Sequence, residues 1–274
     1  MHKFFLFTFF CFFFYRTGFC QGDTTIVVKW FKKGYQKESL GDYRGALYDY
    51  DSSVMVNPNY SKTYFYRGLV KYHLNNLKGS IDDYTIFIET NPQSASAYDN
   101  RGYSKFLLGD NKAAIEDYDK SIAINPNVTK VYLNKGGAEN RLGLLKEALN
   151  DFTKALKLSP NSSDIYFNIG ISKGALSDNS GALDAFNNAI RLRPAFELAF
   201  LYRGTNKGQS KDFDGAMEDF NHCLILNPNN SEAYLNRGAI KFDRNDKEGA
   251  CSDFQKALSL GNKRAPAIIK ENCN

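Results

Sequence analysis

The chain has 274 residues, of which 43% are hydrophobic and 24% are charged, a composition typical of a folded protein rather than a disordered one. Its formal net charge is +5. Without the first twenty residues, which contain Lys3 and Arg16 and no acidic residue, 33 basic residues face 30 acidic ones, so the surface has little general attraction for nucleic acid or anionic membranes.

Residues 1–20 are predicted to be a signal peptide. After a short basic start, residues 4–14 form an apolar run with eight Phe, shorter than the roughly 20 residues needed to span a bilayer and suited to a signal sequence. Gly18 and Cys20 occupy the small-residue positions before a cleavage site, which we expect between Cys20 and Gln21. Two alternatives stay open: lipidation of Cys20, which the large Phe19 disfavours, and an uncleaved anchor. The chain is therefore expected to be exported, to the periplasm or cell surface in a bacterium and into the secretory pathway otherwise, with no membrane span left after cleavage.

An internal repeat of 34 residues dominates the rest of the chain. Six prolines share this spacing: Pro58, Pro92, Pro126, Pro160, Pro194 and Pro228. If each proline is counted as position 32, Asn262 takes that position in the last of seven units: 27–60, 61–94, 95–128, 129–162, 163–196, 197–230 and 231–264. A lead-in, 21–26, precedes them, and a tail, 265–274, is predicted to cap the last unit.

Other positions of the repeat are equally regular. Position 8 is always glycine: Gly34, Gly68, Gly102, Gly136, Gly170, Gly204 and Gly238. Position 24 is always aromatic: Tyr50, Tyr84, Tyr118, Phe152, Phe186, Phe220 and Phe254. The helical spacing of positions 4, 8 and 11, and of 20, 24 and 27, predicts two helices per unit that cross closely at the glycine. Proline ends the second helix, and Ser61, Thr129, Ser163 and Ser231 are the expected N-caps of the next one.

These features resemble the tetratricopeptide repeat, and the resemblance covers nearly the whole chain after residue 20. It implies an all-α fold, an α-solenoid of helix-turn-helix repeats wound as a right-handed superhelix. It further implies a concave face lined by the first helices and a role in binding a protein or peptide.

The sequence departs from the family pattern at positions 7 and 11, which are basic in six units each. Position 23 is acidic wherever position 7 is basic, and the fifth unit has neither, with Ile169 and Ala185 instead. Because both losses fall in one unit, we expect a ladder of ion pairs between the two helices of each unit. A basic strip that binds a ligand is the alternative.

The resemblance implies that positions 2, 5, 6, 9, 12 and 13 of the first helices face a ligand. The candidate binding residues are Phe31, Lys32, Tyr35, Phe65, Tyr66, Leu69, Asn100, Tyr103, Asn134 and Asn168. Asn amides can donate to and accept from a peptide backbone, and aromatic neighbours contribute binding energy. The alternative is that these residues only pack neighbouring helices. Lys32, Asn100 and Asn134 have the chemistry of a carboxylate clamp but not the register of one.

The cysteines and histidines are predicted to have structural rather than catalytic roles. We expect a disulfide between Cys251 and Cys273 that staples the tail to the last unit, and a buried thiol at Cys223. No metal-ligand spacing, phosphate loop or nucleophile motif is present, so we expect no metal, no cofactor, no small-molecule substrate and no catalysis. The sequence thus predicts a non-catalytic scaffold of the cell envelope that binds a protein or peptide, not nucleic acid, in its groove. The alternative is a permanent subunit of an envelope complex that uses its convex face.

Overall fold

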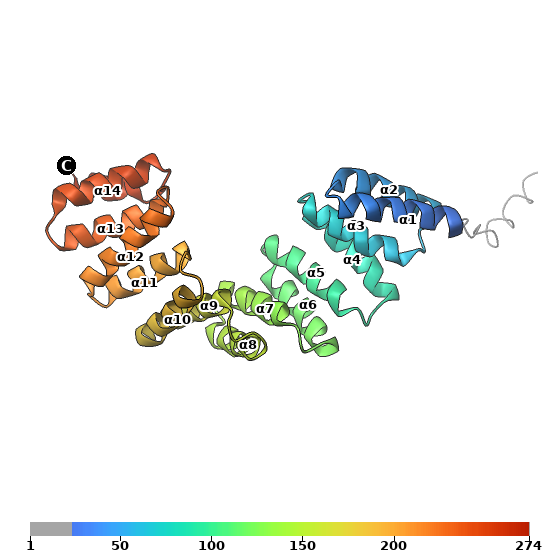
Figure 1. Ribbon diagram of the computed structural model, residues 1–274, viewed down its shortest axis with the longest axis horizontal. Coiled ribbons are helices and arrows are strands. Elements are labelled where there is room, and N and C mark those ends of the chain that lie inside the picture. Colours follow the sequence, from blue (N-terminus) through green and yellow to red (C-terminus); the bar gives the residue numbers. More distant parts are fainter. Residues whose placement is uncertain (1–23, 274) are drawn as a thin grey trace, which may run out of the picture. The chain divides into compact units, whose positions relative to one another are not determined.

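The computed structural model describes residues 24–273, where fifteen α-helices follow one another without a strand (Figure 1). The predicted signal peptide lies outside these residues. The chain divides into two compact units, the first ending at Ala113 and the second beginning at Ala114. The earlier helices are α1 (Thr24–Ser39), α2 (Tyr43–Val56), α3 (Ser61–His73), α4 (Leu77–Thr90), α5 (Ala95–Leu107) and α6 (Asn111–Ile124). The later ones are α7 (Thr129–Arg141), α8 (Leu145–Leu158), α9 (Ser163–Ala175), α10 (Asn179–Leu192), α11 (Glu197–Gln209), α12 (Phe213–Leu226), α13 (Ser231–Asp243), α14 (Lys247–Ser259) and α15 (Ala265–Asn272).

The helices keep the 34-residue period of the sequence. From α3 onward, every first helix of a pair begins 34 residues after the previous first helix, and the second helices, from α2 to α14, have the same spacing. Within each unit, a first helix packs mainly on the second helix of its pair, and that second helix also packs on the first helix of the next pair. The predicted all-α solenoid is confirmed. Helix α1 is longer than the other first helices because it begins at Thr24, inside the predicted lead-in.

In six repeats the position-8 glycine lies against the position-24 ring of the partner helix. A Cβ atom on Gly136 or Gly170 would lie 2.5 Å from the position-24 ring of Phe152 or Phe186, respectively. Both rings are almost fully buried. Because side-chain contacts this short do not occur, only glycine permits the crossing, which confirms the prediction made from the sequence.

The N-caps differ from the prediction by one residue. Ser61, Thr129, Ser163 and Ser231 are the first residues of their helices, and the capping position belongs to the residue before each. There, Ser162 accepts a hydrogen bond from the N–H of Ile165, and Asn230 accepts one from Ala233. A side chain at the preceding position reaches the exposed N–H groups of the first turn, which a residue already inside the helix cannot do.

The tail folds as α15 and covers the open end of the last repeat. Ile268 and Ile269 pack against a buried cluster that includes Leu235 and Phe254. In the structure, the sulfur atoms of Cys251 and Cys273 lie 2.01 Å apart and join α14 to the end of α15. Cys223 is buried and free.

The disulfide remains a prediction for the protein in solution. Peptide mapping of unreduced protein should find Cys251 and Cys273 joined, whereas two thiols open to alkylation would contradict this. Replacement of Cys273 by Ser should speed amide hydrogen exchange in residues 265–272, because it removes a crosslink expected to stabilise this contact by about 2–3 kcal/mol. Cys223→Ser serves as the control, and exchange in residues 265–272 should be unchanged by it.

Candidate functional site

The first helices of successive repeats touch one another within each unit, α1 to α3 to α5 in the first, and α7 through α9 and α11 to α13 in the second. They therefore lie on the inner face of each stack (Figure 1). This is the face on which the family resemblance places a ligand, and the candidate binding residues lie on these helices.

Aromatic rings of α1 and α3 form one continuous group, the α1–α3 cluster, made of Phe31, Tyr35, Phe65 and Tyr66. The Tyr66 ring lies 5.3 Å from Phe31, 5.5 Å from Tyr35 and 5.4 Å from Phe65, between ring centroids, and each of these pairs meets edge to face. Phe31 is only 7% exposed, whereas Tyr35 is 50% exposed. Phe31 is therefore the buried member of the cluster, whereas Tyr35 has the larger surface that a partner could contact.

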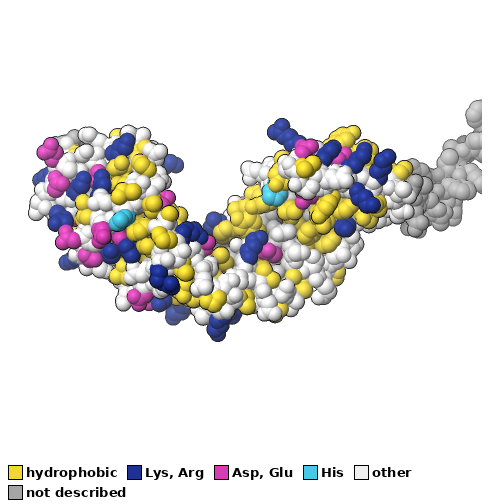
Figure 2. Space-filling view, viewed as in Figure 1, with side chains coloured by type: hydrophobic (Ala, Val, Ile, Leu, Met, Phe, Trp, Pro, Cys, Tyr) yellow, Lys and Arg dark blue, Asp and Glu magenta, His cyan; other side chains and the backbone are white. Residues whose placement is uncertain are grey.

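Cations surround the α1–α3 cluster. The ammonium of Lys62 lies 5.0 Å from the ring centroid of Phe31, and Lys32 is exposed on α1. Glu38 lies on the same face, and its carboxylate accepts a hydrogen bond of 2.6 Å from the hydroxyl of Tyr50. Burial raises the pKa of Glu38. Figure 2 shows hydrophobic side chains over these first repeats with Lys and Arg side chains among them.

A second aromatic group, the α3–α5 cluster, continues along the first unit. Tyr72 lies 5.8 Å from Tyr103, which lies 6.2 Å from Phe106, between centroids. Leu69 and Asn100 are partly buried on the same two helices. Sequence analysis did not name Tyr72, Phe106 or Lys62, although they occupy positions 12 and 2, which the family pattern assigns to the ligand face.

The remaining candidates, Asn134 and Asn168, belong to the second unit. The amide nitrogen of Asn168 donates to the backbone oxygen of Asp164 in its own helix at 2.8 Å. The amide nitrogen of Asn134 is buried and has no hydrogen-bond partner among the described residues. The Asn168 amide thus binds within its own helix, and the buried Asn134 nitrogen offers no exposed donor to a ligand.

The second unit repeats the aromatic arrangement of the first. Phe167, Phe186, Phe196 and Tyr202 occupy positions 5, 24, 34 and 6 of successive repeats, as Phe31, Tyr50, Tyr60 and Tyr66 do in the first unit. Phe167 lies 4.8 Å from Phe196 and 5.4 Å from Tyr202, and Tyr202 is 42% exposed. The same repeat positions thus place a tyrosine on the inner face of both units, exposed at Tyr202 and partly buried at Tyr66.

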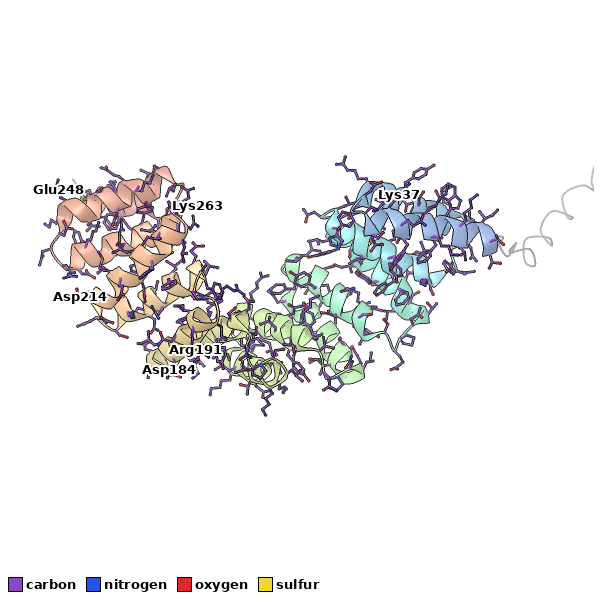
Figure 3. The ribbon with its side chains drawn as sticks, viewed as in Figure 1. Lys37, Asp184, Arg191, Asp214, Glu248 and Lys263 are labelled. Carbon is purple, nitrogen blue, oxygen red and sulfur yellow. A yellow bond between two sulfur atoms is a disulfide. The ribbon has the colours of Figure 1, made fainter. Side chains whose placement is uncertain are left out.

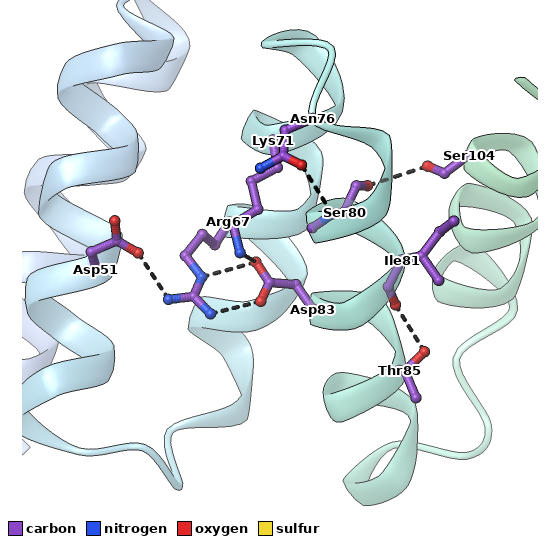
Figure 4. Close-up of polar contacts among 10 residues, drawn as sticks. Asp51, Arg67, Lys71, Asn76, Ser80, Ile81, Asp83, Thr85 and Ser104 are labelled. Atoms are coloured by element: carbon purple, nitrogen blue, oxygen red, sulfur yellow. Dashed lines mark hydrogen bonds and ion pairs between the residues drawn. The ribbon is translucent and has the colours of Figure 1, made fainter. Parts of the chain in front are cut away.

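The predicted ion pairs form within repeats. The guanidinium of Arg67 donates twice to Asp83, at 2.6 and 2.8 Å, and Lys71 lies 2.8 Å from the same carboxylate (Figure 4). Asp83 is almost fully buried. The same arrangement recurs in the sixth repeat, with Arg203, Lys207 and Asp219, and in the seventh, with Arg237, Lys241 and Asp253. These bases are neutralised by acids, which favours the ion-pair ladder over a basic binding strip.

The first repeat departs from this prediction. Asp49 pairs with Lys37 at 2.7 Å, whereas the ammonium of Lys33 lies 4.7 Å from the ring centroid of Trp30. Lys33 was expected to pair with Asp49. Among the described residues Lys33 has no acid of a preceding repeat beside it, and the Trp30 ring attracts its ammonium instead.

The fourth repeat has an acid, Glu139, where six repeats have lysine. The ammonium of Lys135 faces three carboxylates, those of Asp119 at 2.8 Å, Asp151 at 2.9 Å and Glu139 at 3.5 Å. Lys154 provides a second cation, 2.9 Å from Asp151. Burial, and then the negative charge of Asp151, raise the pKa of Glu139 to about 7.

Glu139→Gln should make the protein more stable above neutral pH. A carboxyl whose pKa is higher in the folded state than in the unfolded state binds protons more tightly when folded, so the free energy of unfolding falls as pH rises from about 4.5 to about 7. Glutamine removes this dependence. We expect a gain of about 1–3 kcal/mol at pH 8 and little change at pH 4.5, measured by urea denaturation at both values. An equal effect at the two pH values would contradict the assignment.

Among the described residues, no helix is long and apolar enough to cross a membrane, and no three His, Cys, Asp or Glu side chains are grouped so that they could hold a metal ion.

Comparison with known proteins supports the division of the chain into 34-residue repeats. The family model of the tetratricopeptide repeat matches residues 95–128, 129–162 and 231–262. No curated protein matches the chain. A tetratricopeptide repeat protein from Parabacteroides merdae is 21% identical and superposes with a TM-score of 0.74 over 91% of this chain and all of that one.

Two further solved structures show the same fold. The C-terminal part of a repeat protein from Cytophaga hutchinsonii is 15% identical, with a TM-score of 0.66 over 86% of this chain and 98% of that one. YrrB, described as a protein with an unusual peptide-binding site, is 22% identical, with a TM-score of 0.54 over 69% of this chain and 97% of that one. This fold is typical of non-catalytic scaffolds for protein–protein interaction. Residues 95–162 and 231–262 thus match the tetratricopeptide repeat, and the series of helix pairs has the tetratricopeptide-repeat fold.

Proposed function

We propose that this protein is a non-catalytic scaffold of the cell envelope that binds a peptide or a protein segment on the inner face of its first repeats. The observation that carries the proposal is the α1–α3 cluster, in which accessible aromatic surface lies next to cations. Tyr35 is half exposed, and Lys32 and Lys62 are exposed beside it. The envelope location rests on the signal-like residues 1–20 and the predicted disulfide.

The chemistry of the α1–α3 cluster favours a segment with apolar and acidic side chains. Aromatic rings at the centre of an interface contribute much of the binding energy, because they bury a large area with few rotatable bonds. The acid of this face, Glu38, is already engaged by Tyr50, whereas Lys32 forms no ion pair among the described residues. The cations beside the rings thus complement a negatively charged partner.

The alternative, a permanent subunit that assembles through its second helices, fits less well. In the second unit these helices carry exposed charges, namely Asp184 and Arg191 on α10, Asp214 on α12 and Glu248 on α14 (Figure 3). The large exposed apolar side chains of these helices lie in their last turns: Leu158 on α8, Ile225 and Leu226 on α12, and Leu258 on α14. Permanent interfaces are depleted in charge at their centre, which this surface is not.

Site-specific crosslinking can distinguish the two faces. A photoreactive phenylalanine analogue is placed at Tyr35 or at Ile225, and the protein is irradiated in living cells of its source organism. A partner crosslinked from Tyr35 and not from Ile225 would support the proposal. The reverse pattern would favour the second-helix face, and no crosslink from Tyr35 would overturn binding at the cluster.

A binding measurement with the identified partner then tests the residues. Combined Lys32→Ala, Tyr35→Ala and Lys62→Ala should weaken binding at least about tenfold, since exposed anchors of this kind contribute about 1 kcal/mol or more each. The matched control replaces three exposed residues of the second helices, Asp184, Arg191 and Ile225, by Ala and should leave binding unchanged. Phe31 is left intact because its replacement would disturb the core.

A further inference from the structure

The base at position 7 joins neighbouring repeats as well as the two helices of its own repeat. Arg67 reaches Asp51 of the preceding repeat at 2.8 Å, and Lys135 reaches Asp119 at 2.8 Å. The same backward contact joins Arg101 to Thr85, Arg203 to Asn187 and Arg237 to Asn221. In every case the acceptor is at position 25, on the second helix of the preceding repeat.

The first repeat has the base, but among the described residues no helix precedes α1. Lys33 is exposed and has no carboxylate or amide acceptor among residues 24–273. On α1 it follows Ile26 and Trp30 at helical spacing, and Tyr48 of α2 lies 6.3 Å from the Trp30 ring, centroid to centroid. Ile26 is 44% exposed and Tyr48 is 65% exposed. We call this surface, made of Ile26, Trp30, Lys33 and Tyr48, the end face.

In the other repeats, the surface equivalent to the end face packs against the second helix of the preceding repeat. The position-4 rings Tyr64, Tyr132 and Phe200 are buried to below 9% exposure, and Tyr98, Tyr166 and Tyr234 are partly buried, as Trp30 is. At the other end of the described chain, α15 covers the last repeat. The end face thus has the ring and the cation of a repeat junction, with no second helix against it among the described residues.

We propose that the end face docks an amphipathic helix of a partner protein, and that this helix carries a carboxylate that pairs with Lys33. The partner helix takes the place that a preceding second helix has at the repeat junctions. Its acid meets Lys33 as Asp51 meets Arg67 and as Asp119 meets Lys135. The single acid among residues 1–23 of this chain is Asp23, which directly precedes α1 and lies ten residues before Lys33, so a helix formed by residues 1–22 would lack that acid. A second copy offers no suitable helix, because its second helices face the next repeat or α15.

A helix from the chain itself provides the probe. A synthetic peptide of residues 111–124, held helical by a lactam bridge on its outer side, carries Asp119, the natural partner of a position-7 lysine. Trp30 is the only tryptophan of the protein, and the peptide has none, so a blue shift of tryptophan emission reports docking at the end face directly. The protein is expressed from its complete sequence, and circular dichroism verifies the fold of each variant.

Charge reversal tests the pairing. We expect saturable binding of the peptide, weakened at least about fivefold by Lys33→Glu in the protein or by Asp119→Lys in the peptide, and largely restored when both changes are combined. Lys78→Glu, an exposed charge reversal on α4, should leave binding unchanged. Absence of a Trp30 emission shift, or equal losses without restoration in the combined pair, would overturn the proposal. Neither result bears on crosslinking from Tyr35, which tests a different face.

Discussion

Gly170→Ala should lower the free energy of unfolding by about 2–3 kcal/mol, whereas Gly174→Ala, one turn further along α9, should raise it by up to about 1 kcal/mol. A Cβ atom at Gly170 would meet the buried Phe186 ring at 2.5 Å, and its nearest atoms all belong to that ring. Either α9 and α10 separate or the ring leaves its preferred rotamer. At Gly174 the nearest atoms lie 3.8 Å away, an ordinary contact, so alanine adds helix propensity without strain.

The two glycines form a matched pair because they share a helix, a substitution and a denatured state. Urea denaturation followed by far-ultraviolet circular dichroism measures both, and hydrogen exchange in α9 and α10 shows whether the change is local, as expected when each repeat contacts only its neighbours. Similar changes in the two variants would mean that helix propensity, and not the crossing distance, decides the effect at Gly170.

Local features of the fold could be predicted from the sequence because they repeat. Proline restricts the backbone wherever it occurs and glycine permits close helix crossings, so six prolines and seven glycines in register leave few alternatives to paired helices. The joint absence of base and acid at Ile169 and Ala185 correctly indicated pairing within a repeat. Capping was predicted one residue too late, because the sequence pattern shows where polar residues recur but not where the chain turns into the helix.

Contacts between repeats were much harder to predict. No pattern within one repeat shows that Arg67 also reaches Asp51, since that depends on how repeats stack. For the same reason the departure of Lys33 was missed, since it follows from the lack of a neighbouring acid from a preceding helix among residues 24–273. At the candidate site, Tyr35 and Tyr66 were identified from position alone, whereas the burial of Phe31 depends on Tyr50 and Tyr60 from other helices.

Asp219→Ala should destabilise the protein by about 3 kcal/mol, the largest loss we expect from a single change at the ion pairs. Asp219 is fully buried and holds both Arg203, at 2.5 Å, and Lys207, at 3.0 Å. Without it, two partly buried cations face each other, and the loss of one partner of a buried pair leaves an uncompensated charge. Chemical denaturation near pH 7 measures the loss, and Asp214→Ala, an exposed acid on α12, is the control.

The fifth repeat shows how that loss can be reversed. There Ile169 and Ala185 replace base and acid, and the remaining Lys173 lies 3.6 Å from Asp178. The sixth repeat has Asp212 at the same position, so Arg203→Ile combined with Asp219→Ala gives Lys207 the surroundings of Lys173. We expect the double variant to lie within about 1 kcal/mol of the original protein, because apolar residues often replace a buried ion pair without loss. If the losses of stability in the two single variants simply add in the double variant, the ion pairs themselves stabilise the stack. The fifth repeat must then have other interactions that compensate for the missing pair.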